Sequence, residues 1–458
     1  MEKMDNKNNQ KAINKMEHQP ILSLILSMSL PPLISMFMQY SYNFIDCMFI
    51  ARINEEALTA ASLSFPMTTL MLAISIGIGV GINILVSRNL GRKNQDEANN
   101  VVSHGLIMSS VLGTILVVVL YFLVKPYFSS FRIEDEVFNY GLDYMYICVF
   151  LQLPNMVHIA IQKIIQATGN MVAPMLFQIA GVLLNFILDP ILIFGWGPFP
   201  EMGIKGAAIS TVLGYTLAML LAFYVLLFTK QKVKVKTKNF KMNLEIFKDI
   251  TILGLPSFIM NALGAFMVSI TNKFLITYSS TAVAFFGAYF KAQQMVVMTV
   301  NGLIQGCIPI MSYNFGAKNY HRLRKTFKYG TIIAVILLSI GGLLLFVFPR
   351  EVLKTFMASE EMLVFGVPAL RIMTVGYVFN GVSTMIASYM QSISKVKISI
   401  FINLCRQLLV LTLAMWIFDS LFVMIGIWYS FIVTEFLTCI IAIYYLKKTE
   451  NELKLSKY

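Results

Sequence analysis

Residues 85–94 read LVSRNLGRKN, and residues 310–319 read IMSYNFGAKN. The two stretches carry Ser, Asn, Gly, Lys and Asn at the same relative positions, 225 residues apart. The same shift aligns Leu30-Pro31 with Leu255-Pro256, Gly77 with Gly302, Gly141 with Gly366, Asn155 with Asn380 and Gln166 with Gln391. A constant shift over this distance predicts that the chain consists of two homologous halves.

Long apolar segments surround both copies of this motif. The 458 residues are 57% hydrophobic and only 13% charged, with a mean hydropathy of +0.72. A soluble domain would need more charges on its surface. Runs of about 20 apolar residues cross a hydrocarbon core as helices, whereas a β-barrel would show short alternating strands. We expect spans at about 21–50, 61–86, 101–124, 137–163, 173–196, 206–228, 249–276, 282–311, 329–348, 365–390, 397–418 and 422–446.

We therefore predict an all-α integral membrane protein with twelve transmembrane helices in two homologous six-helix bundles and a cleft between them. Six spans in each half give both halves the same topology. The basic stretch TKQKVKVKTKNFKMN (229–243) alternates Lys with Val and Thr, which suggests a connector or a surface strand. The expected parts are a cytoplasmic tail (1–20), an N-terminal bundle (21–228), a basic cytoplasmic linker (229–248), a C-terminal bundle (249–446) and a second cytoplasmic tail (447–458).

The positive residues predict the orientation of the spans. Most of the 36 Lys and Arg lie in the two tails and in the loops after the even-numbered spans. Positive residues concentrate in cytoplasmic loops, so both termini are expected in the cytoplasm of a multi-pass protein of the inner (plasma) membrane. The opposite loops hold only Arg52, Lys125, Arg132, Lys205, Arg350 and Lys354.

Several classes of function find no support in the sequence. The net charge is +13, and the positive residues lie between the apolar segments. This distribution favours a role in membrane topology over binding to a nucleic-acid partner. GxxxxGK[ST], HExxH and GxSxG motifs are absent, so we expect no enzyme and no cofactor. His158 has no second histidine at ligand spacing, and the five cysteines form no CxxC pair, so no metal site is expected.

The first expected span carries a stripe of polar residues. Gln39, Tyr42 and Asp46 are three and four residues apart, which places them on one helical face. Such a stripe should face protein or a water-filled cavity rather than lipid. Polar contacts between helices are the alternative reading, although they do not account for a full negative charge.

The fifth and sixth spans carry further polar residues at a matching depth. Asn185 and Asp189 are four residues apart, Pro190 follows directly, and Thr211 lies one turn into the sixth span. Asp46, Asp189 and Thr211 each lie roughly 6–10 Å inside the outer end of their helices at 1.5 Å per residue. We therefore expect one cluster, able to exchange a proton, a sodium ion or an organic cation.

The second half lacks acids at the matching positions. Asp46 aligns with Thr271, and Asp189 aligns with Ala414 if the shift continues that far. The acids therefore look specific to the function of the first half. Arg406 and Glu435 lie at similar depths in the last two spans, and we expect them to form a structural ion pair.

Four stretches resemble the multidrug and toxic compound extrusion (MATE) family, in particular its MepA-like branch. They are YNFIDCMFIARINEEALTAASLSFP (42–66), LLNFILDPILIFGWG (183–197), GIKGAAISTVLG (203–214) and the two copies of the opening motif. The resemblance implies export of small amphipathic organic cations driven by H⁺ or Na⁺. We expect the lipid bilayer and these cations to be the partners of the protein, and the protein to be a monomer. The candidate residues for cation or substrate binding are Asp46, Asp189, Asn185, Gln39, Tyr42, Thr211 and Asn155.

One departure and one alternative accompany the resemblance. Some members have acids on the seventh and tenth spans, but here the seventh has none and Asn380 lies near the tenth-span position. A C-terminal cation site of that type is therefore not expected. The alternative function is a flippase or exporter of lipid-linked saccharides of the same superfamily, for which Lys291, Arg371 and Arg406 would hold pyrophosphate.

Overall fold

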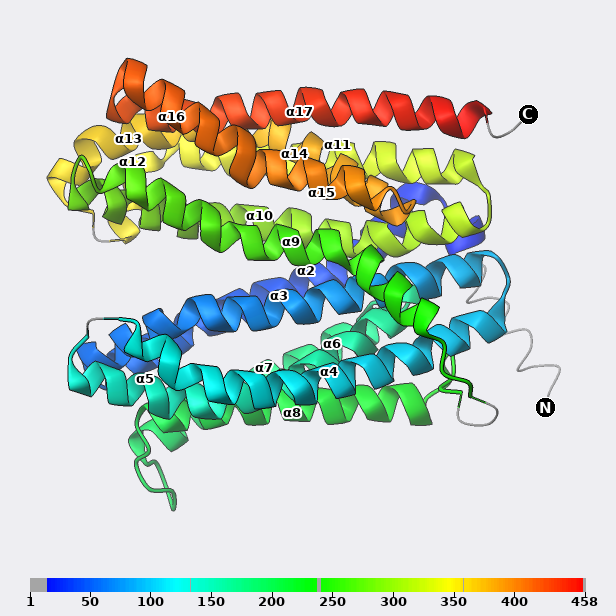
Figure 1. The fold of residues 1–458 in the computed structure, drawn as a ribbon, viewed down its shortest axis with the longest axis horizontal. Coiled ribbons are helices and arrows are strands. Elements are labelled where there is room, and N and C mark those ends of the chain that lie inside the picture. Colours follow the sequence, from blue (N-terminus) through cyan, green and yellow to red (C-terminus); the bar gives the residue numbers. More distant parts are fainter. Residues whose placement is uncertain (1–14, 132, 237–239, 357, 456–458) are drawn as a thin grey trace. The chain divides into compact units, whose positions relative to one another are not determined.

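The described residues of the computed structural model are 15–131, 133–236, 240–356 and 358–455, and they contain helices and no strand (Figure 1). Eleven helices are long and apolar enough to cross a membrane. A twelfth span is formed if α13 (Glu360–Thr374) and α14 (Tyr377–Ser392), which meet at a bend of 45°, are counted as one. The predicted all-α membrane fold is confirmed.

The chain divides into two compact units. Unit 1 is built mainly from Leu30–Phe258 and Ser312–Lys318, and unit 2 from Pro20–Ser29, Ile259–Met311 and the chain from Asn319 onward. Both divisions fall inside long helices, because the first residues of α2 (Ile21–Ala51) join unit 2 and those of α9 (Leu244–Leu275) join unit 1. The domain boundaries expected from the sequence stay a prediction.

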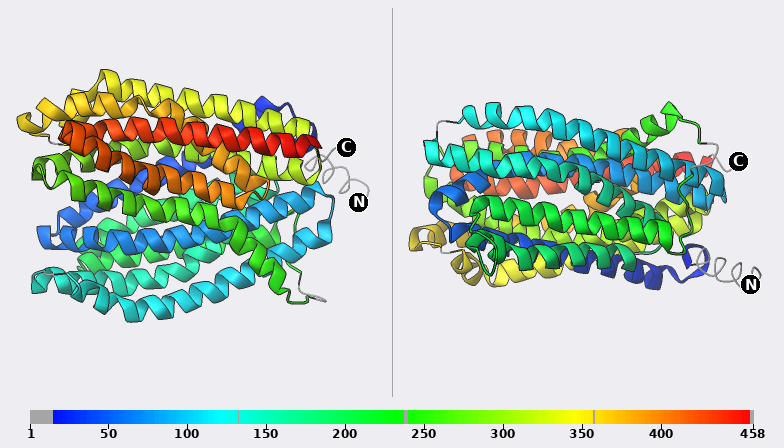
Figure 2. Two further views of the ribbon diagram at one scale, coloured as in Figure 1. Left: turned by 45° about the horizontal axis from the view of Figure 1, so that its top comes forward. Right: turned by 90° about the horizontal axis from the view of Figure 1, so that it is seen from below.

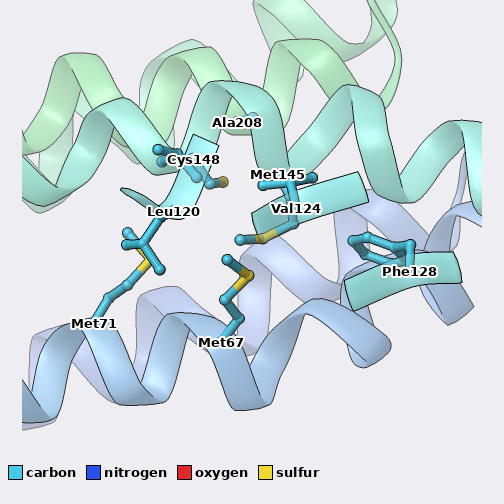
Figure 3. Packing of buried hydrophobic residues seen from close by; sticks show 9 residues of the cluster. Met67, Met71, Leu120, Val124, Phe128, Met145, Cys148 and Ala208 are labelled. Atoms are coloured by element: carbon cyan, nitrogen blue, oxygen red, sulfur yellow. The ribbon is translucent and has the colours of Figure 1, made fainter. Parts of the chain in front are cut away.

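Unit 1 contains most of the first six spans. Between α2 and α9 it consists of α3 (Glu55–Gly91), α4 (Gln95–Ser129), α5 (Asp135–Cys148), the 3₁₀ turn η1 (Val149–Leu151), α6 (Gln152–Ala167), α7 (Val172–Phe194) and α8 (Ile204–Phe228). A buried cluster joins Met67 and Met71 of α3 to Leu120, Val124 and Phe128 of α4 and to Met145 of α5 (Figure 3). Flexible methionines fill the irregular space where these helices meet.

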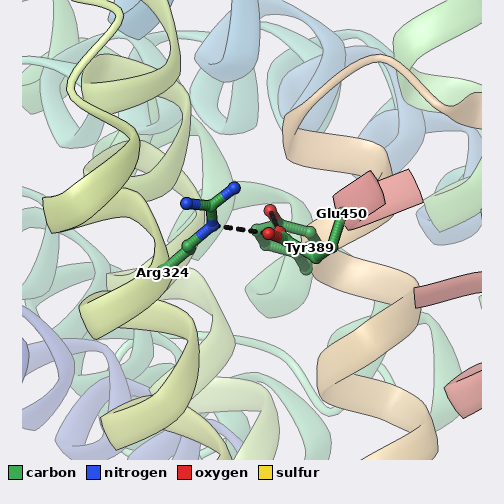
Figure 4. Close-up of polar contacts among 3 residues, drawn as sticks. All are labelled: Arg324, Tyr389 and Glu450. Carbon is green, nitrogen blue, oxygen red and sulfur yellow. Dashed lines mark hydrogen bonds and ion pairs between the residues drawn. The ribbon is translucent and has the colours of Figure 1, made fainter. Parts of the chain in front are cut away.

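Unit 2 contains the remaining spans, which lie alongside one another in both views of Figure 2. They are α10 (Ser280–Gly316), α11 (Tyr320–Val347), the short α12 (Pro349–Thr355), α13, α14, α15 (Val396–Leu404), the π-helical turn η2 (Cys405–Leu409), α16 (Val410–Phe422) and α17 (Met424–Leu455). Near the C-terminus, Glu450 of α17 accepts from Nε of Arg324, 2.5 Å away, and from the hydroxyl of Tyr389 (Figure 4). These contacts tie α11, α14 and α17 together.

The repeated motif has the same structural role in both halves. Lys93 and Lys318 have φ of +60° and +56°, in the left-handed region. The next residues, Asn94 and Asn319, each cap the following helix, since each side chain accepts a backbone N–H at 3.1 Å. The motif therefore ends one helix and starts the next, which explains its strict spacing.

The basic linker does not form the strand that its alternation suggested, as far as its described residues show. Instead it lies along α4. The backbone N–H groups of Lys234 and Lys236 donate to Asn99 Oδ1 and Ser103 Oγ at 2.9 and 2.7 Å. The N–H of Asn243 donates to Nε2 of His104 at 2.8 Å. Side chains of α4 thus replace the neighbouring strand as hydrogen-bond partners.

Candidate functional site

Two carboxylates, one fully buried and one partly buried, lie near each other in unit 1. Asp189 of α7 is fully buried and accepts a hydrogen bond from the hydroxyl of Ser210 on α8. Asp46 of α2 is close enough to interact electrostatically with Asp189. The last turns of α2 and α7 therefore bring together two acids that are far apart in sequence.

Three oxygen atoms in this region have no hydrogen-bond donor within the described part of the chain. They are Oδ1 of Asp46, Oδ2 of Asp189 and Oδ1 of Asn185, all buried and without a hydrogen-bond partner among the described residues. An unsatisfied buried polar atom costs about 1–3 kcal/mol, and more if it is charged. Because all three atoms are acceptors, a proton or a small cation is the species that would satisfy them.

A second group of contacts links α2 to α8 beside the acids. Tyr42, which is buried, lies with its hydroxyl 3.1 Å from Oγ1 of Thr211. Thr211 itself donates to the carbonyl of Ala207 at 2.9 Å. Since a threonine has one hydroxyl proton, Tyr42 must be the donor in its bond to Thr211.

A chain of amides continues from this point across four helices. Gln162 of α6 donates to Gln178 of α7 at 2.9 Å, and Gln178 donates to Gln39 of α2 at 2.9 Å. Gln39 then donates to the hydroxyl of Tyr215 on α8 at 3.0 Å. Every amide in the chain points the same way, so the Tyr215 hydroxyl keeps its own proton for a further acceptor.

These side chains line a small cavity in unit 1. Its walls are formed by Gln39, Tyr42, His158, Gln178, Asn185 and Tyr215, together with Gly181, Val182, Gly214 and Ala218. Gly181 and Gly214 bring α7 and α8 together, because a Cβ on either residue would lie within 2.7 Å of the other's carbonyl oxygen. His158 is almost fully buried, and neither of its ring nitrogens has a hydrogen-bond partner among the described residues.

The sequence-predicted residues occupy different parts of this region. Gln39, Tyr42 and Asn185 line the cavity, whereas Asp46, Asp189 and Thr211 are not part of its wall. Thr211 is joined to the wall by its hydrogen bond with Tyr42, and Asp189 lies one turn after Asn185 on α7. Asn155 of α6 is buried one turn before His158, is not part of the cavity wall, and its Oδ1 has no described partner.

Three polar residues of the cavity wall, His158, Gln178 and Tyr215, are not among the residues predicted from the sequence. Gln178 lies seven residues before Asn185, and Tyr215 lies four residues after Thr211, so both share a helical face with a predicted residue. His158 was considered only as a metal ligand, and no metal-ligating group of three is present among the described residues. The helical spacing was therefore a usable signal for Gln178 and Tyr215.

The residue of the second half that corresponds to Asp189 lies one position further along the chain than the sequence shift predicts. The π-helical turn Cys405–Leu409 contains one more residue than a regular turn, so Asp189 corresponds to Met415 rather than Ala414. The ends of the two helices support this. The N–H of Gly203 bonds to the carbonyl of Ile193, and at the equivalent helix end of the second half the N–H of Val423 bonds to the carbonyl of Asp419. Ile193 and Asp419 are therefore equivalent, and they are separated by one residue more than the shift of 225.

Thr271 and Met415 meet in unit 2, where the Thr271 hydroxyl lies 3.9 Å from the Met415 sulfur. The second bundle thus builds the equivalent helix contact from neutral groups. The acids in unit 1 are accordingly not needed to hold these helices together.

The expected ion pair between Arg406 and Glu435 takes a different form. Among the described residues the two side chains are joined through Asn380. Its Nδ2 donates to Glu435 Oε1 at 2.8 Å, and its Oδ1 accepts from Arg406 Nη1 at 3.2 Å. An amide can bridge an acid and a base because it offers a donor at one atom and an acceptor at the other.

Comparisons with known proteins agree with these observations. The MatE family model matches residues 31–191 and 256–416, two stretches that are also separated by 225 residues. The multidrug export protein MepA of Staphylococcus haemolyticus is 24% identical over 445 residues, covering 96% of each chain. MepA of Staphylococcus aureus strain MW2 is 24% identical over 430 residues, covering 93% of each chain.

Solved structures show the same fold. A transporter of the MOP superfamily from Pyrococcus furiosus, described as having a binding pocket of reversed polarity, has a TM-score of 0.91 at 23% identity, covering 97% of this chain and 99% of that one. An outward-facing multidrug resistance MATE transporter has a TM-score of 0.91 at 24% identity with the same coverage. With the family model matched over both halves, the chain belongs to the MatE family of multidrug and toxic compound extrusion transporters.

Proposed function

We propose that the protein is a secondary active multidrug efflux transporter that exchanges H⁺ or Na⁺ for amphipathic organic cations across the cell membrane. The observation that carries the proposal is the group of three buried acceptor oxygens, on Asp46, Asp189 and Asn185, which have no protein donor among the described residues. A transporter needs a site that is charged in one state and neutralised in another, and buried carboxylates meet that need.

The cavity beside the acids supports the choice of substrate class. Aromatic rings and amides line it, and such surfaces accept apolar cations through cation–π contacts and hydrogen bonds. The MepA multidrug export proteins, to which the chain is similar, support the same class. Methionine-rich packing such as that of Met67, Met71 and Met145 adapts readily to different shapes.

The coupling ion is either a proton or sodium. A proton requires one lone pair, and two neighbouring carboxylates readily share one. Sodium is a hard cation that prefers several oxygen ligands, which the three unpartnered oxygens and the Thr211 hydroxyl would supply. We further propose that the protein acts as a monomer in the plasma membrane, with both termini in the cytoplasm.

The flippase alternative requires several basic side chains in the interior. Lys291 and Arg371 are exposed, and Arg371 donates to the carbonyl of Phe346 at 3.2 Å. Arg406 is held by Asn380 and Thr384. Two of the three cations are therefore outside any buried cluster, which favours the organic-cation exporter over a pyrophosphate carrier.

Efflux from proteoliposomes under separately imposed gradients tests the proposal. Vesicles with the full-length protein and a fluorescent organic cation should show transport driven by either a proton or a sodium gradient, and none with both gradients collapsed. Transport of a lipid-linked pyrophosphate saccharide with no movement of the organic cation would favour the alternative.

A further inference from the structure

Unit 2 contains a partly buried carboxyl group, that of Glu435, which the proposed function does not use. Oε1 of Glu435 accepts from Asn380, whereas Oε2 is buried and has no hydrogen-bond partner among the described residues. Arg406 donates both to Asn380 and to the hydroxyl of Thr384, and Thr384 donates to Asn380 Oδ1 at 3.2 Å. Asn380, Arg406 and Thr384 thus form a closed ring of hydrogen bonds, to which Glu435 is attached through Oε1. Its Oε2 atom is left without a partner within the described residues.

Two irregular helices meet at this carboxyl group. The 45° bend between α13 and α14 contains Gly376, and a Cβ on Gly376 would lie 3.4 Å from Cγ of Glu435. Arg406 belongs to the π-helical turn between α15 and α16. Helix breaks and π turns inside membrane helices are frequent at functional sites, since they change local geometry at low cost.

Unit 1 has a corresponding arrangement at a 3₁₀ turn inside the equivalent span. There the 3₁₀ turn Val149–Leu151 separates α5 from α6, at positions that match 374–376 in the repeat. Asp46 interacts electrostatically with Tyr144 and Cys148 at the end of α5. Each unit therefore places a partly buried acid beside the irregular turn of this span.

The acid in unit 2 comes from a different helix and is not required by the scaffold. Ser210 Oγ and Ser430 Oγ each lie at hydrogen-bond distance from the carbonyl oxygen three residues earlier, at 2.9 and 2.6 Å, which aligns α8 with α17 at a shift of 220. Glu435 then corresponds to Tyr215, a neutral residue. A carboxylate at this position is consequently an addition of the second half.

We propose that Glu435 is a second proton-binding site, and that its charge sets the bend between α13 and α14. A hydronium ion transfers one proton to Oε2: an O–H bond of hydronium breaks, an O–H bond to Oε2 forms and water is released. The combined charge of Glu435 and Arg406 rises from zero to +1. Sodium is disfavoured here because only one oxygen is free and a guanidinium lies beside it.

The groups around Glu435 are consistent with a single titrating site. Arg406 faces it from η2, Tyr377 from α14 and Tyr289 from α10, and Cys439 lies on its own helix. Within the described residues no titratable group of α13, α15 or α16 interacts with it. Loss of the Glu435 charge would leave Arg406 without its counter-charge, which favours movement of the Asn380 segment.

Infrared difference spectroscopy of the reconstituted full-length protein tests proton binding directly. Between high and low pH the wild type should show a carboxylic-acid component, separate from any signal of Asp46 and Asp189, that is lost in Glu435→Gln. The matched control is Glu452→Gln, which removes an exposed acid of the same helix that pairs with Lys395 at 2.7 Å, and it should keep this component. An unchanged component in Glu435→Gln would overturn the proposal.

A distance measurement tests the link to the bend. Spin labels on cysteines introduced at the exposed Val364 and Val378 would report the angle between α13 and α14. We expect the distance to change with pH in the wild type and to stay fixed in Glu435→Gln. A pH-dependent change that persists in the variant, or no change in the wild type, contradicts the second half of the proposal.

A second variant guards against failure to fold. If Glu435→Gln is not produced, the double variant Glu435→Gln/Arg406→Gln removes both charges and should restore yield, because neither charge is then left alone in the interior. It should also lack this carboxylic-acid component and the pH-dependent distance. Both measurements are independent of drug transport, so they remain valid even if the proposed efflux function fails.

Discussion

Tyr42 donates its hydroxyl proton to Oγ1 of Thr211, because Thr211 already donates its own proton to the carbonyl of Ala207. Replacing Thr211 with alanine therefore removes an acceptor and leaves the Tyr42 hydroxyl without it. We expect gradient-driven efflux to fall severalfold rather than disappear, since one hydrogen bond between neutral groups is worth about 1 kcal/mol. Thr211→Ser keeps the hydroxyl and should transport at nearly the wild-type rate; equal losses in both variants would contradict this assignment.

Asp46 and Asp189 are predicted to be essential for coupling. Asp46→Asn should abolish gradient-driven efflux while the protein still inserts and folds, because an amide cannot alternate between a charged and a neutral state. Asp189→Asn should do the same or nearly so. Asp143→Asn is the control, since it removes an exposed acid that pairs with Lys205 at 3.2 Å. Wild-type transport by Asp46→Asn under every ion gradient would show that Asp46 is a structural polar residue.

The amide chain should contribute to the stability of the N-terminal bundle. Gln39→Leu removes two hydrogen bonds and leaves Gln178 and Tyr215 each without a partner at one atom. We expect the free energy of unfolding to fall by about 1–3 kcal/mol for the polar groups left unsatisfied. Thermal unfolding in detergent measures this. Phe37→Leu on the exposed side of α2 should change it little, and an equal loss in both would argue against the chain.

Lys232 should make stability depend on pH outside the membrane. Burial, with a smaller effect of Lys15, lowers the pKa of Lys232 from 10.5 to about 8, although its Nζ donates to the Thr168 carbonyl at 2.6 Å. The folded state thus disfavours the charged form, and this cost is complete at neutral pH. It shrinks as the pH rises above about 8 and is gone above 10.5.

The unfolding temperature of the wild type relative to Lys232→Met should accordingly rise between pH 8 and 10.5. Lys234→Met, at an exposed neighbouring position, should follow the wild-type profile. A flat difference between the wild type and Lys232→Met across this range would rule out the effect.

Membrane orientation can be tested with single cysteines in a cysteine-free background. Asn319 caps α11 at the end expected to face the cytoplasm, and Ser130 follows α4 at the opposite end. A membrane-impermeant maleimide should label Ser130→Cys in intact cells and Asn319→Cys only after the membrane is opened. The reverse pattern would overturn the orientation derived from the positive residues.

The sequence by itself determined the fold class, the span positions and the two-fold repeat. Apolar runs long enough to cross a bilayer are a local signal, and a constant shift between similar stretches needs no tertiary information. Helical spacing also placed Gln39, Tyr42 and Asp46 on one face, and the structure shows Gln39 and Tyr42 in contact with α7 and α8.

Tertiary structure alone decided which polar atoms meet. Nothing in the sequence indicates that Asn380 bridges Arg406 and Glu435. A hydrogen bond forms only if the positions of neighbouring helices set the distance between donor and acceptor to within a few tenths of an ångström. Nor does it show that a π turn moves the counterpart of Asp189 from Ala414 to Met415, since one extra residue in a helix leaves no mark in an apolar run. Periodicity fixes the face on which a side chain lies, whereas its partner is set by how neighbouring helices pack.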